Sequence, residues 1–429
     1  MQKLVARGLI TRARAAAVLF VMLICSGCGE TFRPVATPIA PNPPNPSFAH
    51  VALVISSNGP DNPGASTSID VSGDTAVSQS TVGLMPVHAA IVQNNGIRVY
   101  VANSGDGTVS VFSSSSATPV STVSLPTGPY NNTQASPVFV NSTEADAVWV
   151  ADAANNQVDE ILTSNGIAAY QVAVGVDPVA LAETPNTQKL FVANRGSGGS
   201  GGSVTSINPS DRSLNPPIAN ATWISPVAVA VRADSQRAYV LDQGSGMVSA
   251  IDTFAGAVVG SASAGVGANF MVYDPTLNRV YVANPVANTV TLLDVSSDAL
   301  SAVVIPIAHP VSVAALPDGS RVYISSATVS AGNVISQVTV INASDGSLKT
   351  AIPLNTVKQG CVANPSELEI AASADSTRVY VGNCDAGNVS IITTLTDSLV
   401  LQMPAPQAAG VASDGSPLPQ NPVFVLAGP

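Results

Sequence analysis

The chain has 429 residues, of which 46% are hydrophobic and only 10% are charged, with 33 glycines and 32 prolines. A chain of this length can bury a large core, and its few charges and many turn-forming residues favour strands over helices. The formal net charge of −11 opposes contact with nucleic-acid phosphates and anionic lipid headgroups, so we expect no nucleic-acid partner.

Residues 1–27 have the three parts of an export signal: four basic residues, an apolar run over 15–24, and small residues before Cys28. The run is shorter than the ~20 residues that a membrane-spanning helix requires. The segment 25–28, Cys-Ser-Gly-Cys, resembles a bacterial lipobox, although Cys25 stands where that motif usually has Leu. The resemblance implies that Cys28 is lipidated and becomes the mature N-terminus; ordinary signal cleavage is the alternative.

The residues after Cys28 bear on which membrane holds the protein and on how far the folded part stands from it. Gly29 replaces the Asp that retains many lipoproteins at the inner membrane, which favours the outer membrane for an exported protein facing the periplasm or the cell surface. We expect an N-terminal acyl chain to be the link to the bilayer. Residues 28–48 contain the segment RPVATPIAPNPPNPS at 33–47, which predicts a stiff proline-rich tether.

From residue 49 to 429 the chain repeats one phrase, first written RVYVANSGDGTVSVF at 98–112. Its aromatic residue occurs seven times, at spacings of 49, 42, 48, 42, 42 and 57 residues. The seven aromatic positions are Tyr100, Trp149, Phe191, Tyr239, Tyr281, Tyr323 and Tyr380. A period of this length in a strand-rich chain predicts propeller blades of four strands each.

The first repeat unit illustrates the four expected strands. The apolar run 86–92 is suited to the innermost strand, and 98–102 pairs with it as the second strand. Turn residues then lead to a third strand over 108–112 and to an outer fourth strand ending at 120–125. The second strand is apolar on both faces, so both faces must be covered, as stacked blades would cover them.

The phrases Tyr-Val-Ala-Asn at 100–103 and 281–284, with close variants in most other units, resemble the YVTN-family β-propeller repeat. The resemblance covers roughly residues 50–429, while Tyr323-Ile-Ser-Ser departs from the pattern. It implies an all-β propeller fold. The family is defined by its repeat, so the resemblance implies no single activity.

The two ends of the repeat region each contain part of a further unit. Residues 51–55 and 68–71 are expected to be a second and a third strand, and 410–413 and 422–427 a first and a second strand. Together they would form one blade from both termini, which closes the ring without a free sheet edge. This predicts eight blades; seven is the alternative, if one terminal segment instead caps a neighbouring blade.

Two cysteines, Cys361 and Cys384, remain besides the lipidated one after export. They flank antiparallel neighbouring strands at the same end of one hairpin, and an oxidising compartment would join them in a disulfide. Two unpaired thiols are the alternative. No zinc or other metal site is expected, because no further Cys or adjacent His completes a tetrahedral set.

The innermost strands line the axial channel, where most residues are not ionisable. The exceptions that we regard as candidate ligand-binding residues are His88, Glu367 and Glu369, with His309 at the rim. His88 and Glu367 each stand two residues after a proline and are expected to share a register. The two glutamates would lie ~6.5–7 Å apart on one side of their strand, a spacing usable for acid–base chemistry or for a cation. The alternative is that these groups only wet a water-filled channel.

The loops between second and third strands should gather on one rim of the disc, where recognition residues often lie on a rigid scaffold. The candidate rim residues are Asn103, Asp106, Asn155, Asn156, Arg195 and Asp385. The glycine-rich loop 195–203 follows no phosphate-loop pattern.

No nucleophile elbow, zinc-protease motif or Cys-His pair is present in the sequence, so no catalytic residue or cofactor is assigned. The leading hypothesis is a monomeric, lipid-anchored envelope propeller that binds a protein or glycan partner through one rim. One alternative is an enzyme of lactonase-like or periplasmic dehydrogenase-like type that uses the channel residues. Another alternative is a surface-layer or adhesion component.

Overall fold

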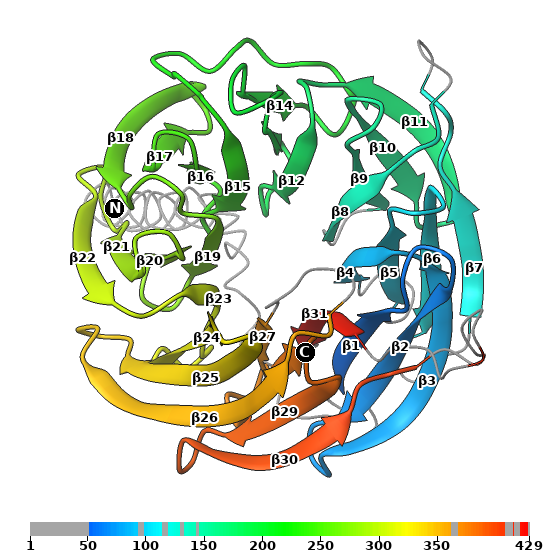
Figure 1. Ribbon diagram of the computed structural model, residues 1–429. Coiled ribbons are helices and arrows are strands. Elements are labelled where there is room, and N and C mark those ends of the chain that lie inside the picture. Colours follow the sequence, from blue (N-terminus) through cyan, green and yellow to red (C-terminus); the bar gives the residue numbers. More distant parts are fainter. Residues whose placement is uncertain are drawn as a thin grey trace, which may run out of the picture. The chain divides into compact units, whose positions relative to one another are not determined.

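The protein is an eight-bladed β-propeller, whose sheets follow one another around a ring (Figure 1). The structure, a computed structural model, describes residues 51–92, 98–113, 119–128, 133–142, 146–361, 368–407, 415 and 421–427. Within these ranges the chain forms 31 β-strands and no helix. The described residues accordingly include no helix long and apolar enough to cross a membrane.

Each blade is named here by its innermost strand, and its strands run outward in chain order, except that the β31 blade continues outward with β1, β2 and β3. The innermost strands are β4 (Pro86–Val92), β8 (Pro137–Ser142), β12 (Pro178–Glu183), β15 (Pro226–Val231), β19 (Phe270–Asp274), β23 (Pro310–Ala315), β27 (Leu368–Ala372) and β31 (Asn421–Ala427). The second strands are β1 (Val51–Ser57), β5 (Arg98–Asn103), β9 (Ala147–Asp152), β13 (Leu190–Asn194), β16 (Arg237–Asp242), β20 (Arg279–Asn284), β24 (Arg321–Ser330) and β28 (Arg378–Asn383).

The third strands are β2 (Pro63–Asp70), β6 (Thr108–Ser113), β10 (Gln157–Leu162), β14 (Ser203–Ile207), β17 (Met247–Asp252), β21 (Thr289–Asp294), β25 (Asn333–Asn342) and β29 (Asn388–Thr393). The fourth strands are β3 (Thr75–Leu84), β7 (Pro119–Ser124), β11 (Ile167–Ala173), β18 (Ala257–Ser263), β22 (Ser301–Pro306), β26 (Leu348–Lys358) and β30 (Ser398–Pro404). Seven blades therefore have four strands, and the β12 blade has three.

The two ends of the chain form the β31 blade together, which confirms eight blades closed by both termini. Strand β1 pairs with β2 on one side and with β31 on the other, and β31 contacts the innermost strands β27 and β4 of both neighbouring blades. The predicted second and third strands from the N-terminal segment are correct. The prediction that residues 422–427 form a second strand is wrong, because β31 is innermost. The N-terminal segment also supplies the polar strand β3, the third strand that it contributes to this blade. The C-terminal segment therefore supplies only the one remaining strand, which is the innermost. The predicted strand at 410–413 lies outside the described residues.

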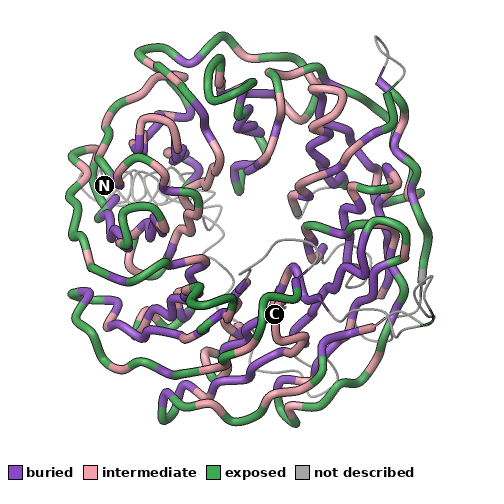
Figure 2. Tube along the Cα trace, viewed as in Figure 1, coloured by how far each residue is buried: buried purple, intermediate pink, exposed green. Residues whose placement is uncertain are grey.

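Stacking of the blades buries both faces of their middle strands. The aromatic residue of the repeat is at most 1% exposed in all seven units. The apolar clusters cross from blade to blade: Tyr281 of β20, for example, packs with Val313 and Val322 of the next blade. Figure 2 shows this pattern, with buried second and third strands and largely exposed outermost strands such as β22. The second strands are thus apolar on both faces because neighbouring blades cover both faces, as predicted.

An arginine at the start of the second strand clasps the next blade at five junctions. In each case its guanidinium reaches the turn between the third and fourth strands of the following blade. The pairs are Arg98 with the Thr163 carbonyl, Arg237 with Asp298, Arg279 with the Ala343 and Ser344 carbonyls, Arg321 with Asp397, and Arg378 with Asp74. Since Arg is planar and carries five donors, it can bridge two turns at once.

Candidate functional site

The innermost strands place one residue each in a layer around the axis. Five of these strands begin with proline followed by a β-bulge, since proline cannot donate to the ladder. We define the layer by backbone pairing: each member pairs with the third residue of the four-residue phrase Tyr-Val-Ala-Asn, such as Ala102, or with its counterpart Ile55. The members are Phe424, His88, Phe139, Ala180, Ala228, Phe270, Ser312 and Glu369. Glu369 is level with His88, because Glu369 pairs with Gly382 as His88 pairs with Ala102. Glu367 itself lies outside the described residues.

His88 is held between two aromatic rings from the adjacent blades. Its ring centroid lies 3.9 Å from that of Phe139 in a stacked arrangement and 4.5 Å from that of Phe424. The backbone N–H of Val140 donates to His88 Nδ1 at 3.3 Å, which places the proton of the neutral ring on Nε2. Burial lowers the pKa of His88 to about 3, so the ring is neutral at physiological pH. Its basic nitrogen is occupied, which makes it a poor general base.

Glu369 occupies a different part of the same layer. Ser312 on the neighbouring innermost strand donates its Oγ–H to Glu369 Oε2 at 3.1 Å, and burial raises the pKa of Glu369 to about 7. Strand β31 with Phe424 lies between the strands of Glu369 and His88, since β31 contacts β27 on one side and β4 on the other. The layer therefore does not bring this acid and this base together.

His309 lies in the connection that enters β23 and is exposed, as expected for a rim position. Its backbone N–H donates to the side chain of Asn288 at 2.9 Å. Among the described residues, no group of three or more His, Cys, Asp or Glu side chains is placed to hold a metal ion.

Cys361 and Cys384 form a disulfide, with Cα atoms 5.2 Å apart. It joins the segment before β27 to the loop after β28, and the backbone N–H groups of Gly360 and Cys361 also donate to Asp385 Oδ1 at 2.9 and 3.1 Å. The disulfide and Asp385 thus fix the same connection between two blades.

The other predicted rim residues bond within their own rim in a comparable way. Asp106 accepts the N–H of Leu84 at 2.9 Å, and Asn156 Oδ1 accepts the N–H of Asp177 at 2.9 Å. Arg195 pairs with Asp177 at 2.7 Å.

Asn103 and Asn155 also have internal partners. Asn103 is fully buried and donates to the hydroxyls of Thr108 and Ser110, each at 3.0 Å, while Asn155 donates to Asp152 Oδ2 at 2.6 Å. These contacts order the loops, and a recognition role for the rim residues stays a prediction.

A cleft of about 1020 Å³ lies between the β12 and β15 blades. Its walls are the β12–β13 turn (184–189), the segment after β14 at 208–215, the β15–β16 turn (234–237) and the β17–β18 turn (252–254). Turns between first and second strands and between third and fourth strands lie at one end of every blade. The cleft therefore opens on the face opposite the predicted rim loops. Its volume is at the upper end of the ~300–1,000 Å³ typical of ligand pockets.

The cleft exists because this junction departs from the repeat in two ways. The segment after β14 contains Pro209, Pro216 and Pro217, which cannot donate to a ladder, and the fourth strand is missing there. Instead, Ala219 pairs with Ala257 at the start of β18, so the chain crosses to the next blade. In addition, Lys189 stands where five of the other units have the clasping arginine, and its Nζ donates to Asn215. The space that the arginine bridges elsewhere is left open.

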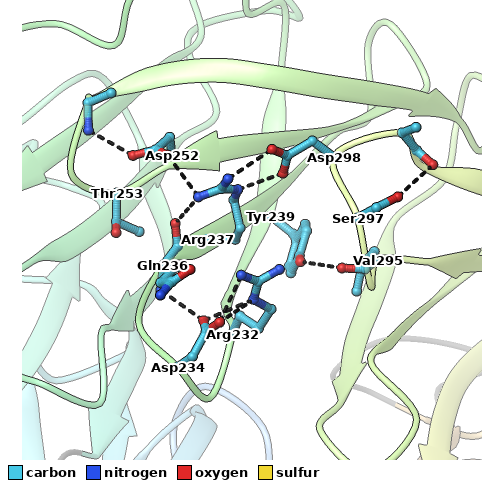
Figure 3. Close-up of polar contacts among 12 residues, drawn as sticks. Arg232, Asp234, Gln236, Arg237, Tyr239, Asp252, Thr253, Val295, Ser297 and Asp298 are labelled. Carbon is cyan, nitrogen blue, oxygen red and sulfur yellow. Dashed lines mark hydrogen bonds and ion pairs between the residues drawn. The ribbon is translucent and has the colours of Figure 1, made fainter.

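The charged residues around the cleft are mostly satisfied by one another (Figure 3). Arg237 donates to both oxygens of Asp298, at 2.7 and 2.8 Å, and to Asp252 at 2.8 Å. Hydrogen bonds from Arg237 hold the pKa of Asp298 below its usual range. Arg232 pairs with Asp234 at 2.8 Å. The network makes the β15 wall of the cleft rigid and leaves little unpaired charge.

Sequence reasoning missed this cleft, because it looked for ionisable residues in the channel and for loops on the other rim. Two signals were available. The repeat spacing widens from 42 to 48 residues between Phe191 and Tyr239, and the widened part contains the three prolines. Lys189 also stands at the position that holds arginine in five of the seven units.

The sequence matches no protein-family model and no curated protein. The fold is similar to apo AztD from Citrobacter koseri, with a TM-score of 0.59 and 11% identity, covering 89% of this chain and 99% of that one. It is also similar to Kuenenia stuttgartiensis hydrazine synthase, with a TM-score of 0.55 and 16% identity, covering 73% of this chain and 96% of that one. A functionally unknown protein from Desulfotomaculum acetoxidans has a TM-score of 0.53 and 12% identity, covering 88% and 99%. At such identities the likeness shows the β-propeller fold alone.

Proposed function

We propose that this chain is a lipid-anchored β-propeller of the cell envelope that binds a protein or glycan partner through the cleft between the β12 and β15 blades. The cleft carries the proposal, since it is a large, concave site on a closed ring and is lined by polar and charged residues together with Phe254. The export signal, the lipobox-like segment ending at Cys28 and the proline-rich tether support the location. The repeat phrases support membership of the YVTN type of propeller.

Binding is favoured over catalysis by the state of the channel residues. His88 has its acceptor nitrogen occupied by Val140. Glu369 lies two blades away from His88 and bonds to Ser312 of its own neighbouring blade. The same groups suit a structural or lining role, because burial keeps the ring of His88 neutral.

Capture of envelope components on the purified protein tests the binding site. Gln188→Trp places a bulky ring on an exposed turn of the cleft wall, and Arg195→Ala alters the opposite rim. We expect Gln188→Trp to abolish specific retention and Arg195→Ala to leave it intact. Retention that survives Gln188→Trp and is lost in Arg195→Ala would move the site to the rim loops.

The anchor is tested separately by Cys28→Ala. We expect the variant to lose incorporation of labelled fatty acid and to leave the membrane fraction. Unchanged acyl labelling of the variant would refute lipidation at this residue.

A further inference from the structure

We propose that the cleft takes a neutral glycan, a chain of uncharged sugar rings. This inference rests on the proposed function and specifies its ligand. The argument depends on three features of the cleft: its paired charges, its unpaired neutral groups and one fully exposed aromatic ring.

The charges of the cleft do not suit a polyanion. Arg237 is bound to Asp252 and Asp298, and Asp234 is bound by Arg232. Lys189 is the remaining cation of the lining, and it donates to the amide oxygen of Asn215. One ammonium in a chain of net charge −11 does not favour a phosphorylated or otherwise polyanionic ligand.

The neutral polar groups of the lining are available for a ligand. The amides of Gln188 and Gln236, the Nδ2 of Asn186 and the hydroxyl of Thr187 line the cleft and make no hydrogen bond to any other residue that the structure describes. Amides and hydroxyls both donate and accept, as sugar hydroxyls do. Each side of such a contact can therefore satisfy the other.

Phe254 supplies an apolar platform at the same place. It is 99% exposed at the tip of the β17–β18 turn, and Asp252 Oδ1 fixes that turn by accepting the N–H groups of Phe254 and Ala255 at 3.0 and 2.8 Å. The face of an aromatic ring is electron-rich and attracts weakly positive C–H groups. A pyranose ring presents such a C–H face together with polar hydroxyls, which matches Phe254 beside the amides.

The cleft is less suited to an extended peptide. A peptide usually binds a sheet by adding a strand to a free edge. The end of β14 nearest the cleft is already covered, because Ile207 pairs with Leu214 and the N–H of Asn215 donates to the Ser206 carbonyl. The cleft thus offers side chains from turns and no free ladder at that edge.

Titration calorimetry with neutral hexasaccharides of glucose, mannose, galactose, xylose and N-acetylglucosamine tests the inference. We expect at least one of them to bind, Phe254→Ala to weaken that binding at least tenfold, and Gln188→Ala to weaken it severalfold. The matched control is Leu395→Ala. Leu395 is 88% exposed at the corresponding turn of the β27 blade and does not line the cleft, so its replacement should change the affinity less than twofold.

Binding of no hexasaccharide, or binding that Phe254→Ala and Gln188→Ala leave unchanged, overturns the inference. Envelope capture with the same variants separates this failure from failure of the proposed function. One possible result is capture that depends on Gln188 and Phe254, is lost after protease treatment of the extract, and survives periodate oxidation of its sugars. That result keeps the cleft as the binding site but identifies its ligand as a protein. Capture that no cleft variant affects refutes both.

Discussion

The most unusual single side chain of the interior is Asp159 on β10. In the other repeat units its position holds Ser or Thr, such as Ser110, whose hydroxyl accepts from the asparagine that ends the second strand. In the β8 blade both partners are acids, Asp152 and Asp159, and Asp159 is fully buried. Gln157 donates to Asp159 Oδ1 at 2.9 Å, whereas Asp159 Oδ2 has no hydrogen-bond partner. Burial and then the neighbouring Asp152 raise the pKa of Asp159 to about 8.

This carboxyl predicts a fall in stability as pH rises. In the folded protein Asp159 keeps its proton up to about pH 8, whereas in the unfolded chain it loses it near its ordinary value of 3.8, so the folded state binds more protons between these values. The contribution of Asp159 to the free energy of unfolding is therefore most favourable below pH 4, and it is lost as pH rises toward 8. In the wild type, the free energy of unfolding should fall by on the order of 3 kcal/mol between pH 5 and 8 because of this group. We expect that fall to be absent in Asp159→Asn.

Urea unfolding at the two pH values measures this difference. Asp211→Asn is the control, because Asp211 is exposed. An identical pH dependence in the wild type and Asp159→Asn would show that Asp159 is ionised in the folded protein.

The channel residues show what sequence can specify at this scale. The sequence correctly located His88 and Glu369 on innermost strands. The shared register predicted for Glu367 and His88 falls outside the described residues, and the structure places Glu369 level with His88 on a strand that begins at Leu368. The rings around His88 come from Phe139 and Phe424, more than 50 and 300 residues away, and local pattern does not encode such contacts.

At the scale of elements, the recurrent arginine clasp explains how neighbouring blades are held at their outer turns. The clasp by Arg378 is special, since it joins the β27 blade to Asp74 of the N-terminal segment. Both side chains are mostly buried, at 23% and 14% exposure, and two guanidinium nitrogens, Nε and Nη2, donate to Asp74.

We expect Arg378→Met to lower the free energy of unfolding by about 1–3 kcal/mol, because it leaves the buried Asp74 without its partner. Arg232→Met is the comparison, since Arg232 pairs with Asp234 inside one turn and joins no blades. Its cost should be smaller. Equal losses in chemical unfolding of the two variants would show that the clasp between blades has no special weight.

The missing outer strand of the β12 blade is the element-scale feature that sequence analysis did not assign. Pattern and period predicted a four-stranded unit there, as in the other blades. The three prolines forbid the ladder locally, but where the freed segment goes is decided by its pairing with β18 of the next blade. A contact between blades of this kind cannot be deduced from one unit of the repeat.

At the scale of the whole molecule, ring closure depends on β31. This strand is seven residues long, yet it pairs with β1 and packs against both neighbouring blades. Eight blades and their closure by both termini were predicted from the seven repeats and the partial unit at each end, with seven blades as the alternative. The order of strands inside the closing blade was not, because the polar β3 resembles a linker.

Deletion of residues 421–429 is therefore expected to open the ring. Strand β1 would lose a paired edge, and the innermost strands on either side would lose their neighbour. We expect a lower midpoint of thermal unfolding and faster proteolysis within residues 51–84. A truncated protein as stable and as protease-resistant as the full chain would show that the other seven blades close without it.

The central claim is that the cleft between the β12 and β15 blades, and not the channel or the opposite rim, is the binding surface. Hydrogen exchange of the purified protein with and without solubilised envelope extract tests it most directly. We predict that the extract slows exchange in the turns 184–189 and 252–254 and leaves the strands around His88 and the loop 195–203 unchanged. Protection confined to that loop or to the channel strands, with the cleft turns unaffected, would contradict the account.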